Sequence, residues 1–277
     1  MLGIEIAILS DKGGRSYNED ACGHWHSDRH LCCVLADGAG GHGGGDVASR
    51  LAVETLIGAF ADTPTDDGQA LAGLVWATNE RLLEHRASDK RLRDMHTTVV
   101  CLVLDFVDAT AHWSHVGDSR LYWFRDGRLH DRTLDHSLVQ SLINAGVLAP
   151  EQAREHPRRS ELQSALGTRP EDLQVGASGG HVEVQAGDAF LLCSDGLWEF
   201  VGDEAMEHAL GLASSPSAWL EVLEQQVREA TRNRASHDNF SAVAVWLVEP
   251  LDEAASGADE AAVDDADGDP GLPLLED

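Results

Sequence analysis

Short apolar runs along the chain alternate with longer stretches in which apolar residues recur every three to four positions. Strands are expected over residues 3–10, 30–36, 97–107, 109–116, 121–124, 128–130, 182–184, 189–193 and 240–248. Most are predicted from the short runs, 3–10 from its alternation of apolar and polar residues, and 121–124 with 128–130 as a hairpin around Asp126-Gly127. The helical spacing covers residues 46–60, 66–88, 137–146, 203–212 and 217–232, and a further short helix is expected over 150–156. Strands come in blocks with helix pairs between them, which favours an α+β fold with two sheets inside and helices outside over alternating βαβ units.

The corner between the predicted strand at 30–36 and the first predicted helix is unusual. The apolar run stops at Asp37, six glycines follow between Gly38 and Gly45, and the helix begins near Asp46. Glycines let backbone or a ligand approach closely. A carboxylate at the end of a buried strand is costly unless it holds a cation. Two interpretations fit this corner taken alone: an ordinary strand-turn-helix connection, or a cation site.

Three more acidic residues share this context. Asp118 and Asp195 each follow a predicted strand beside a glycine, and Asp238 stands just before the last strand. Each one alone could cap a turn. Together with Asp37 they would form a site with too many like charges to remain unpaired. Because no His/Cys cluster has ligand spacing, the oxygen ligands favour Mg²⁺ or Mn²⁺ over zinc.

Composition excludes some classes of binding partner and indicates the cellular compartment. The formal net charge is −28 and the only lysines are Lys12 and Lys90, which argues against nucleic acid or an anionic membrane as a partner. The five cysteines form no CxxC and mostly lie in apolar runs, as expected in a reducing cytoplasm. The start of the chain lacks the pattern of a signal peptide, and no run of eighteen apolar residues predicts a membrane span. Residues 249–277 contain eleven acidic residues and no Lys or Arg, the composition of a disordered, solubilising tail.

Six motifs occur in register along the chain: Arg15-x-x-Asn18-Glu19-Asp20, Asp37-Gly38-x-Gly40-Gly41-His42, Gly117-Asp118-Ser119-Arg120, Asp135-His136-Ser137, Ser194-Asp195-Gly196-Leu197-Trp198 and Asp238-Asn239. The set resembles the metal-dependent PPM (type 2C) serine/threonine protein phosphatases, in particular the bacterial branch, over about residues 4–248. The resemblance implies a four-layer αββα sandwich of two antiparallel sheets flanked by helix pairs. We therefore expect a catalytic domain at 1–248, with a flap insertion at 137–165, followed by the acidic tail at 249–277.

The resemblance also implies roles for individual residues. Two metal ions, with a third bound more weakly, would be held by Asp37 as the bridging ligand, the Gly38 carbonyl, Asp195, Asp238, Glu19 and Asp118. Arg15 would grip the substrate phosphate as a two-pronged donor, and Asp20 and Asn239 would orient the ligands. The catalytic residues would thus be Arg15, Asp37 and Asp195.

Three residues in or near the motifs, Ala39, His42 and His96, bear on how closely the chain follows the family pattern. Ala39 stands where many eukaryotic members carry a histidine proposed as general acid, so protonation of the leaving group would fall to metal-bound water or to another group. His42 is interpreted as a structural hydrogen-bonding residue. His96 replaces a usual glycine and would either tighten the metal site or have no effect. None of these differences removes a metal ligand.

These observations predict a cytoplasmic, monomeric phosphoprotein phosphatase. Hydroxide activated at a binuclear Mn²⁺ or Mg²⁺ centre would attack phosphoserine or phosphothreonine, and the partners would be phosphoproteins and a cognate bacterial Ser/Thr kinase. The main alternative is a pseudophosphatase that binds phosphoproteins without turnover. Hydrolysis of small phosphoesters, or a role in a stress-signalling partner switch, is a third possibility and would need a different flap or a sensor domain.

Overall fold

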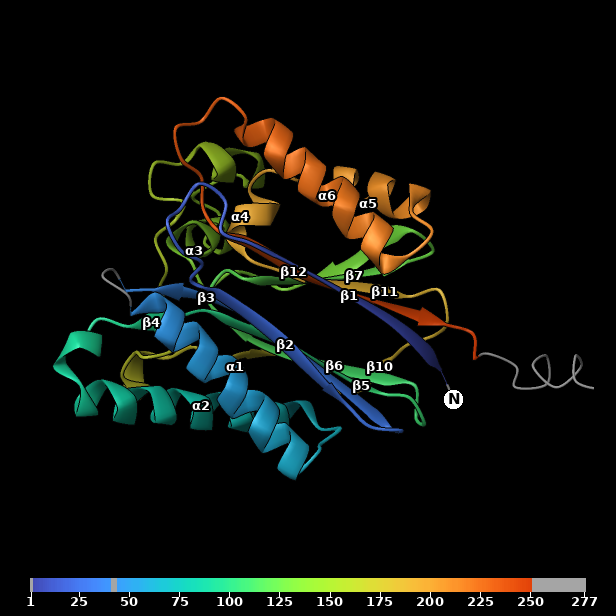
Figure 1. The fold of residues 1–277 in the computed structure, drawn as a ribbon, viewed down its shortest axis with the longest axis horizontal. Coiled ribbons are helices and arrows are strands. Elements are labelled where there is room, and N and C mark those ends of the chain that lie inside the picture. The colour runs from blue at the N-terminus through green and yellow to red at the C-terminus, as the bar shows by residue number, and fades with distance from the viewer. Residues whose placement is uncertain (1, 41–43, 251–277) are drawn as a thin grey trace, which may run out of the picture.

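Two antiparallel sheets lie face to face, and each carries a pair of helices on its outer side (Figure 1). The computed structural model describes residues 2–40 and 44–250. The first sheet has the order β1-β12-β11-β7-β8 and contains β1 (Gly3–Asp11), β12 (Phe240–Val248), β11 (Ala189–Cys193), β7 (Arg120–Arg125) and β8 (Arg128–Arg132). The second has the order β10-β6-β5-β3-β2, built from β10 (Val182–Glu183), β6 (Thr110–Val116), β5 (Val99–Asp105), β3 (His30–Ala39) and β2 (Asp20–His26), while β4 (His96–Thr97) pairs with β3 and β9 (Gly176–Ala177) with β6.

The helices complete the outer layers. The second sheet is covered by α1 (Gly45–Asp62) and α2 (Gly68–Ser88), and the first by α5 (Asp203–Leu212) and α6 (Pro216–Thr231) (Figure 1). The predicted four-layer αββα architecture is confirmed. Among the described residues no helix is long and apolar enough to cross a bilayer.

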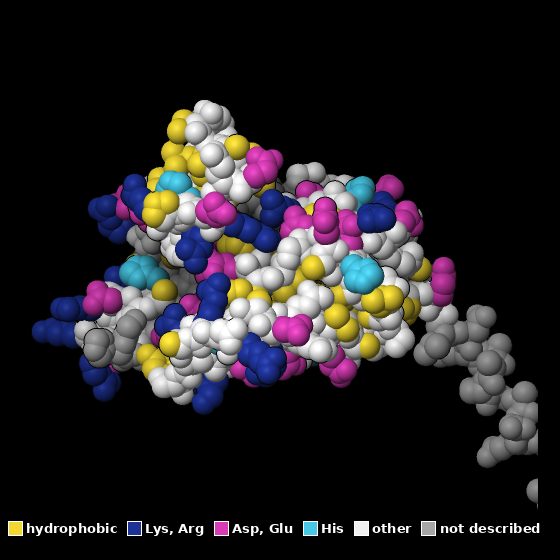
Figure 2. Space-filling view, turned by 90° about the horizontal axis from the view of Figure 1, so that it is seen from above, with side chains coloured by type: hydrophobic (Ala, Val, Ile, Leu, Met, Phe, Trp, Pro, Cys, Tyr) yellow, Lys and Arg dark blue, Asp and Glu magenta, His cyan; other side chains and the backbone are white. Residues whose placement is uncertain are grey.

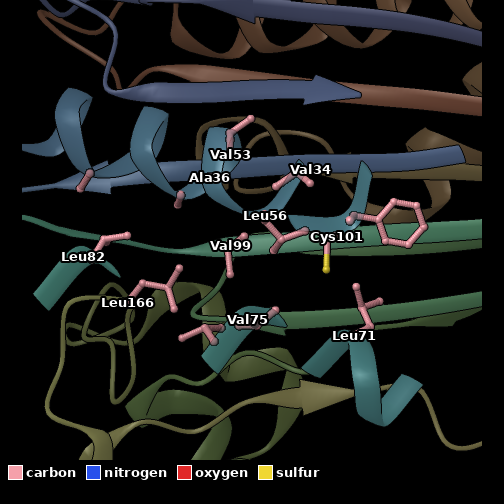
Figure 3. Close-up of a cluster of buried hydrophobic side chains, with 14 of the residues drawn as sticks. Val34, Ala36, Val53, Leu56, Leu71, Val75, Leu82, Val99, Cys101 and Leu166 are labelled. Atoms are coloured by element: carbon pink, nitrogen blue, oxygen red, sulfur yellow. The ribbon is translucent and has the colours of Figure 1, made fainter. Parts of the chain in front are cut away.

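Three apolar layers hold the sandwich together, and the central strands contribute to two of them. Along β3, Cys33 and Leu35 pack between the sheets, whereas Val34 and Ala36 face the helices. Figure 3 shows the helix-side layer, in which Val34 and Ala36 lie close to Leu56 of α1. Burial on both faces explains why β3 appears in the sequence as a continuous apolar run without alternation.

The insertion at 137–165 is helical, as predicted. It contains α3 (Leu138–Asn144), which Ser137 caps by accepting a hydrogen bond from the Gln140 amide (3.2 Å), and the 3₁₀ helix η2 (Pro150–Glu155). Three further short helices are η1 (Lys90–Leu92), η3 (Pro170–Asp172) and α4 (Asp195–Trp198). The insertion follows β8 and precedes β9 along the chain.

Three predictions about local structure were wrong. Strand β2 was not expected, because its sequence contains no apolar run and most of its side chains are only partly buried. The strand predicted over 30–36 continues to Ala39, since Gly38 and Ala39 pair with β4. The predicted strand 97–107 is correspondingly split at Thr98 into β4 and β5.

Candidate metal centre

The acidic residues singled out at strand ends come together at one end of the sandwich. Burial raises the pKa of Asp37 well above its ordinary range, and the charges next in importance are those of Asp20, Asp195, Asp118 and Asp238. These acids come from both sheets. The structure therefore brings Asp37, Asp118, Asp195 and Asp238 into one electrostatic group, as the sequence predicted.

The pKa values of the other members of the group are shifted in the same direction. Burial, followed by the charges of Asp118 and Asp238, raises the pKa of Asp195 well above its ordinary range. Burial and the nearby Asp135 carboxylate raise the pKa of Asp118 to about 7. The neighbouring negative charges repel one another, and this repulsion adds to burial in raising the pKa values. A cation bound between the carboxylates would offset the repulsion.

The backbone of Asp37 is fixed from three directions. Its amide donates to the Thr98 hydroxyl (2.9 Å), and its carbonyl accepts from the Thr98 amide and the Thr97 hydroxyl (2.8 Å each). The Thr98 hydroxyl is in turn 2.6 Å from that of Ser119. Because the main chain takes these bonds, the carboxylate of Asp37 is left available to the acidic group.

The glycines next to Asp37 allow two chain segments to touch. The Gly38 amide donates to the Glu19 carbonyl (3.1 Å), and a Cβ at Gly38 would collide with the Gly45 carbonyl and the Glu19 carbonyl. A Cβ at Gly45 would collide with the Glu19 carboxylate. Glycine at these positions thus lets the Glu19 side chain lie directly against the start of α1.

Glu19 itself is the centre of a second set of contacts. Burial and then the charge of Asp46 raise its pKa. Its amide donates to the Asn239 side chain (2.8 Å), whose amide group donates to the Lys12 and Tyr17 carbonyls (2.8 and 3.1 Å). Asn239 therefore ties the 12–17 loop to the start of β12, which is consistent with the orienting role expected for it.

Asp20 and Arg15 occupy different positions relative to solvent. Asp20 is 8% exposed, lies opposite Asp37 in the β2–β3 register, and accepts a hydrogen bond from the Ser194 hydroxyl (2.8 Å). Burial raises its pKa to about 6. Arg15 lies at the rim, where its guanidinium pairs with Asp238 at 2.7 Å and both side chains are about half exposed.

The donor set fits a hard divalent cation. Buried carboxylate oxygens of Glu19, Asp20, Asp46 and Asp195 have no hydrogen-bond donor among the described residues. Unpartnered carboxylate oxygens are the ligands that Mn²⁺ and Mg²⁺ prefer. No three of these acids place one oxygen each within 4.8 Å of the others in the described part of the chain. Ligation here would therefore involve side-chain rotation or bridging water.

Two acidic residues of this region were missed from the sequence. Asp46, in the first turn of α1, contributes more than any other charged group to the raised pKa of Glu19. Glu199 raises the pKa values of both Asp118 and Asp195. The spacing of four between Asp195 and Glu199 places them on one face of a helical turn, which was the available signal.

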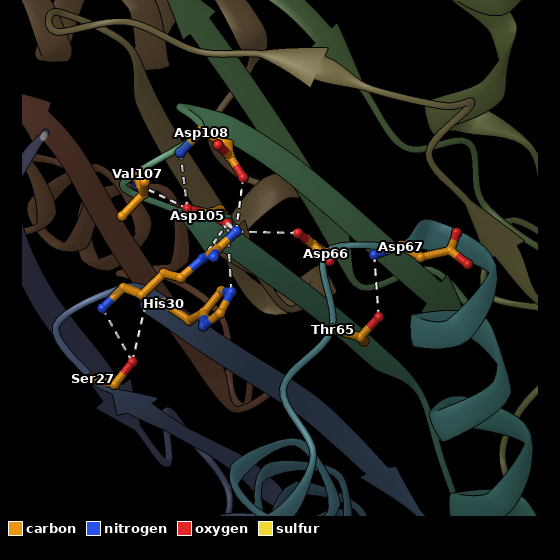
Figure 4. Close-up of polar contacts among 9 residues, drawn as sticks. Ser27, His30, Thr65, Asp66, Asp67, Asp105, Val107 and Asp108 are labelled. Atoms are coloured by element: carbon orange, nitrogen blue, oxygen red, sulfur yellow. Dashed lines mark hydrogen bonds and ion pairs between the residues drawn. The ribbon is translucent and has the colours of Figure 1, made fainter.

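A different acidic trio lies at the other end of β3. Single oxygens of Asp66, Asp105 and Asp108 lie within 4.8 Å of one another, the only such trio in the described residues. The guanidinium of Arg29 contacts all three, at 3.4, 2.6 and 2.7 Å respectively. Figure 4 shows the three carboxylates turned toward this shared contact. An arginine already provides the positive charge, so this trio is a structural ion-pair cluster.

Two of the three positions compared with the family pattern, Ala39 and His96, lie in the described part of the chain. Ala39 pairs with His96 across β3 and β4. The His96 ring contacts the Asp94 carbonyl (3.0 Å) and Arg86 (3.4 Å), and burial lowers its pKa. His42 lies outside the described residues, as does most of the predicted tail.

Comparisons with known proteins agree on one family. The model of the family described as Protein phosphatase 2C matches residues 12–240. The chain is 32% identical over 253 residues to the protein phosphatase PhpP of Streptococcus pneumoniae, covering 89% of this chain and 98% of that protein. It is 35% identical over 227 residues to the serine/threonine protein phosphatase PstP of Mycobacterium tuberculosis, covering 81% of this chain and 42% of that longer protein.

Solved structures give the same result. The Mycobacterium tuberculosis serine/threonine phosphatase PstP/Ppp superposes with a TM-score of 0.76 at 32% identity, over 90% of this chain and 100% of that one. The catalytic domain of PstP in complex with two manganese ions gives a TM-score of 0.72 at 31% identity, again over 90% and 100% of the two chains.

Proposed function

The chain belongs to the bacterial protein phosphatase 2C family of serine/threonine protein phosphatases, and from that premise we propose a metal-dependent mechanism and a role for each site residue. Phosphoserine and phosphothreonine in proteins would be hydrolysed at a binuclear Mn²⁺ or Mg²⁺ centre, with a third ion bound more weakly. The observation that carries this proposal is the gathering of buried acidic residues, of which Glu19, Asp20, Asp46 and Asp195 each have one carboxylate oxygen without a donor among the described residues. The two manganese ions in the related PstP domain support the choice of metal.

The ligands come from five separate segments of the chain. We assign them as Asp37, the Gly38 carbonyl, Glu19, Asp118, Asp195 and Asp238. When bound, such ions lower the pKa of water toward neutrality and stabilise charge on a phosphoryl group. The main chain of Asp37 donates to the Thr98 hydroxyl and accepts from the Thr98 amide, which would hold Asp37 in place, and Asn239 and Asp20 would orient their neighbours.

Arg15 would bind the substrate phosphate. Its guanidinium lies at the exposed rim of the acidic group and now pairs with the Asp238 carboxylate. The planar guanidinium can donate two parallel hydrogen bonds to phosphate oxygens. A phosphate bound there would be held next to Asp238, so that the reacting phosphorus faces the acidic group.

The remaining assignments complete the proposal. Residues 1–248 would form the catalytic domain, 137–165 the flap, and 249–277 a separate acidic tail, whose residues 251–277 lie outside the described part of the chain. The protein would act in the cytoplasm as a monomer on phosphoproteins produced by a cognate Ser/Thr kinase. The five cysteines, none of which forms a disulfide, are compatible with a reducing compartment.

The test compares two substrates, p-nitrophenyl phosphate and a phosphothreonine peptide. The wild type is expected to hydrolyse both with Mn²⁺ and to lose this activity with a chelator. Asp195→Asn should lower the rate at least about 100-fold, because even indirect partners of metal ligands typically contribute 10–100-fold. Asp28→Asn, the same change at an exposed position, is the matched control.

Wild-type turnover by Asp195→Asn would overturn the metal assignment. Phosphopeptide binding by the wild type with Mn²⁺ but without turnover would instead support the pseudophosphatase alternative.

A further inference from the structure

A cleft of about 820 Å³ separates the flap from the helices of the opposite wall. Flap residues from Ser137 to Arg159 form one side, and residues 198–204, between α4 and α5, form the other. Trp198 lines the cleft, and its indole N–H donates a hydrogen bond to the Asp118 carbonyl (2.9 Å). The cleft therefore begins directly beside the candidate metal centre.

Arginine is concentrated around this cleft although the chain as a whole is strongly acidic. The cleft is lined by five arginines, from a chain with only 20 Lys and Arg: Arg120, Arg132, Arg154, Arg159 and Arg234. In Figure 2, Lys and Arg side chains gather at the end of the molecule that carries β4 and α3 in Figure 1, with acidic side chains visible between them. The arginines thus bring positive charge to a cleft whose lining also contains five acidic residues: Asp135, Glu151, Glu199, Asp203 and Glu204.

Two of the five arginines already have carboxylate partners. Arg120 makes a two-pronged pair with Asp135 (2.7 and 2.8 Å) and stacks on the Trp198 ring at 3.5 Å. Arg159 pairs with Glu199 at 3.2 Å. Both guanidinium groups are therefore already held by carboxylates, and the Arg159–Glu199 pair joins the flap side of the cleft to the opposite side.

The guanidinium groups of the other three have no carboxylate within 4 Å among the described residues: Arg132, Arg154 and Arg234. The guanidinium of Arg154 lies over Gly202, and that of Arg234 lies over the Phe200 ring at 4.7 Å. Both arginines line the cleft and are exposed, so an anion in the cleft can reach them.

Acidic residues also line the cleft, and they limit where an anion can bind. Glu151, Asp203 and Glu204 are part of the lining, yet none pairs with Arg132 or Arg154. An anion is favoured only where guanidinium groups outnumber carboxylates.

We propose that this cleft binds the residues flanking the phosphorylated residue of the substrate, and that Arg132, Arg154 and Arg234 select an anionic flanking side chain, either a carboxylate or a second phosphate. This inference rests on the proposed function, because the phosphate held at the metal centre places the flanking residues at the mouth of the cleft. Guanidinium groups suit both anions, since their planar donors match carboxylate and phosphate oxygens. Without these arginines, the net charge of −28 would repel acidic substrates.

The experiment compares three phosphothreonine peptides that differ only at the second and third positions on either side of the phosphothreonine. These positions carry glutamine, glutamate or phosphoserine. Release of phosphate from the phosphothreonine is followed by mass spectrometry with Mn²⁺, and kcat/KM is compared between peptides. The wild type is expected to prefer an anionic peptide over the glutamine peptide about tenfold, the contribution of one charge-assisted pair.

Charge-reversal variants then test whether the cleft arginines cause the preference for anionic peptides. Arg154→Glu and, as a second variant in case the first folds poorly, Arg132→Glu should reduce the ratio of anionic to glutamine peptide to about one or below, since a new carboxylate repels the flanking anion. Arg81→Glu, on α2 outside the cleft, is the matched control and should keep the wild-type ratio. The anionic peptide that loses more of its advantage identifies the carboxylate or the second phosphate as the preferred group.

The two proposals fail in different ways. An active wild type that hydrolyses all three peptides equally overturns the cleft proposal alone, as does a ratio that both cleft variants share with Arg81→Glu. A wild type that hydrolyses none of the peptides with Mn²⁺ overturns the proposed function and this inference with it.

Discussion

Replacing Asp118 by asparagine should stabilise the metal-free protein. Asp118 is only 7% exposed, and burial with the charge of Asp135 raises its pKa from an ordinary 3.8 to about 7. Each pKa unit corresponds to about 1.4 kcal/mol, so keeping this carboxylate ionised at pH 8 costs the fold on the order of 4 kcal/mol. Relaxation of the site reduces this figure, and we expect Asp118→Asn to gain about 2–4 kcal/mol.

The pH dependence gives the sign of the effect. The folded-state pKa is raised, so the folded wild type holds its proton more tightly than the unfolded chain, and its stability falls as pH rises from about 4 to about 7. The asparagine variant lacks this contribution. Its advantage is therefore full above pH 7 and shrinks toward zero near pH 4.

Thermal unfolding with a chelator present measures this directly. For a domain of this size, a gain of 2–4 kcal/mol raises the melting temperature by roughly 4–16 °C at pH 8. Asp28→Asn, which removes the same charge from an exposed position, should change little. If Asp118→Asn melts at or below the wild-type temperature at pH 8, the repulsion inferred for the acidic group is wrong.

Three further changes separate binding, packing and domain organisation. Arg15→Ala should raise the KM for a phosphopeptide roughly 10–100-fold through loss of a charged hydrogen bond, while thermal unfolding shifts little because its ion pair is exposed; an unchanged KM would contradict its role. Gly38→Ala should destabilise the protein by about 1–3 kcal/mol in urea unfolding, since its Cβ meets two backbone carbonyls. Gly58→Ala, in open space on α1, should instead be stabilising, and equal effects would refute the packing argument. Deleting residues 251–277 should leave kcat/KM unchanged, because every proposed ligand precedes them; a loss of activity would place the tail in the catalytic unit.

Most of the architecture could be predicted from local patterns. The apolar runs at β5, β11 and β12 are buried on both faces, so each was recognisable as a central strand. Helices were recognisable from the helical spacing of the residues that each one buries on a single face. Strand β2 escaped prediction because most of its side chains are only partly buried and its sequence contains no apolar run.

The candidate site was predictable only as a set of residues with a shared local context. Asp37, Asp118 and Asp195 each follow an apolar strand beside glycine, a signal visible one segment at a time. Asp46 and Glu199 lack that context: Asp46 lies in the first turn of α1, where acidic residues are common, and Glu199 directly follows the last residue of α4. Their membership of the acidic group follows from where α1 begins and where α4 ends.

The sequence by itself determined the two-sheet class, the glycine-lined Asp37 corner and the family to which the chain is similar. Tertiary structure alone decided that Asp37 and Asp238 interact, that Asn239 bonds to the Glu19 amide, and that Arg29 fills the Asp66–Asp105–Asp108 trio. The physical reason is range. The apolar patterns and the glycine-rich corner are visible within single segments of the sequence. The raised pKa values and the arginine-lined cleft depend instead on charges from distant segments, which only folding brings together.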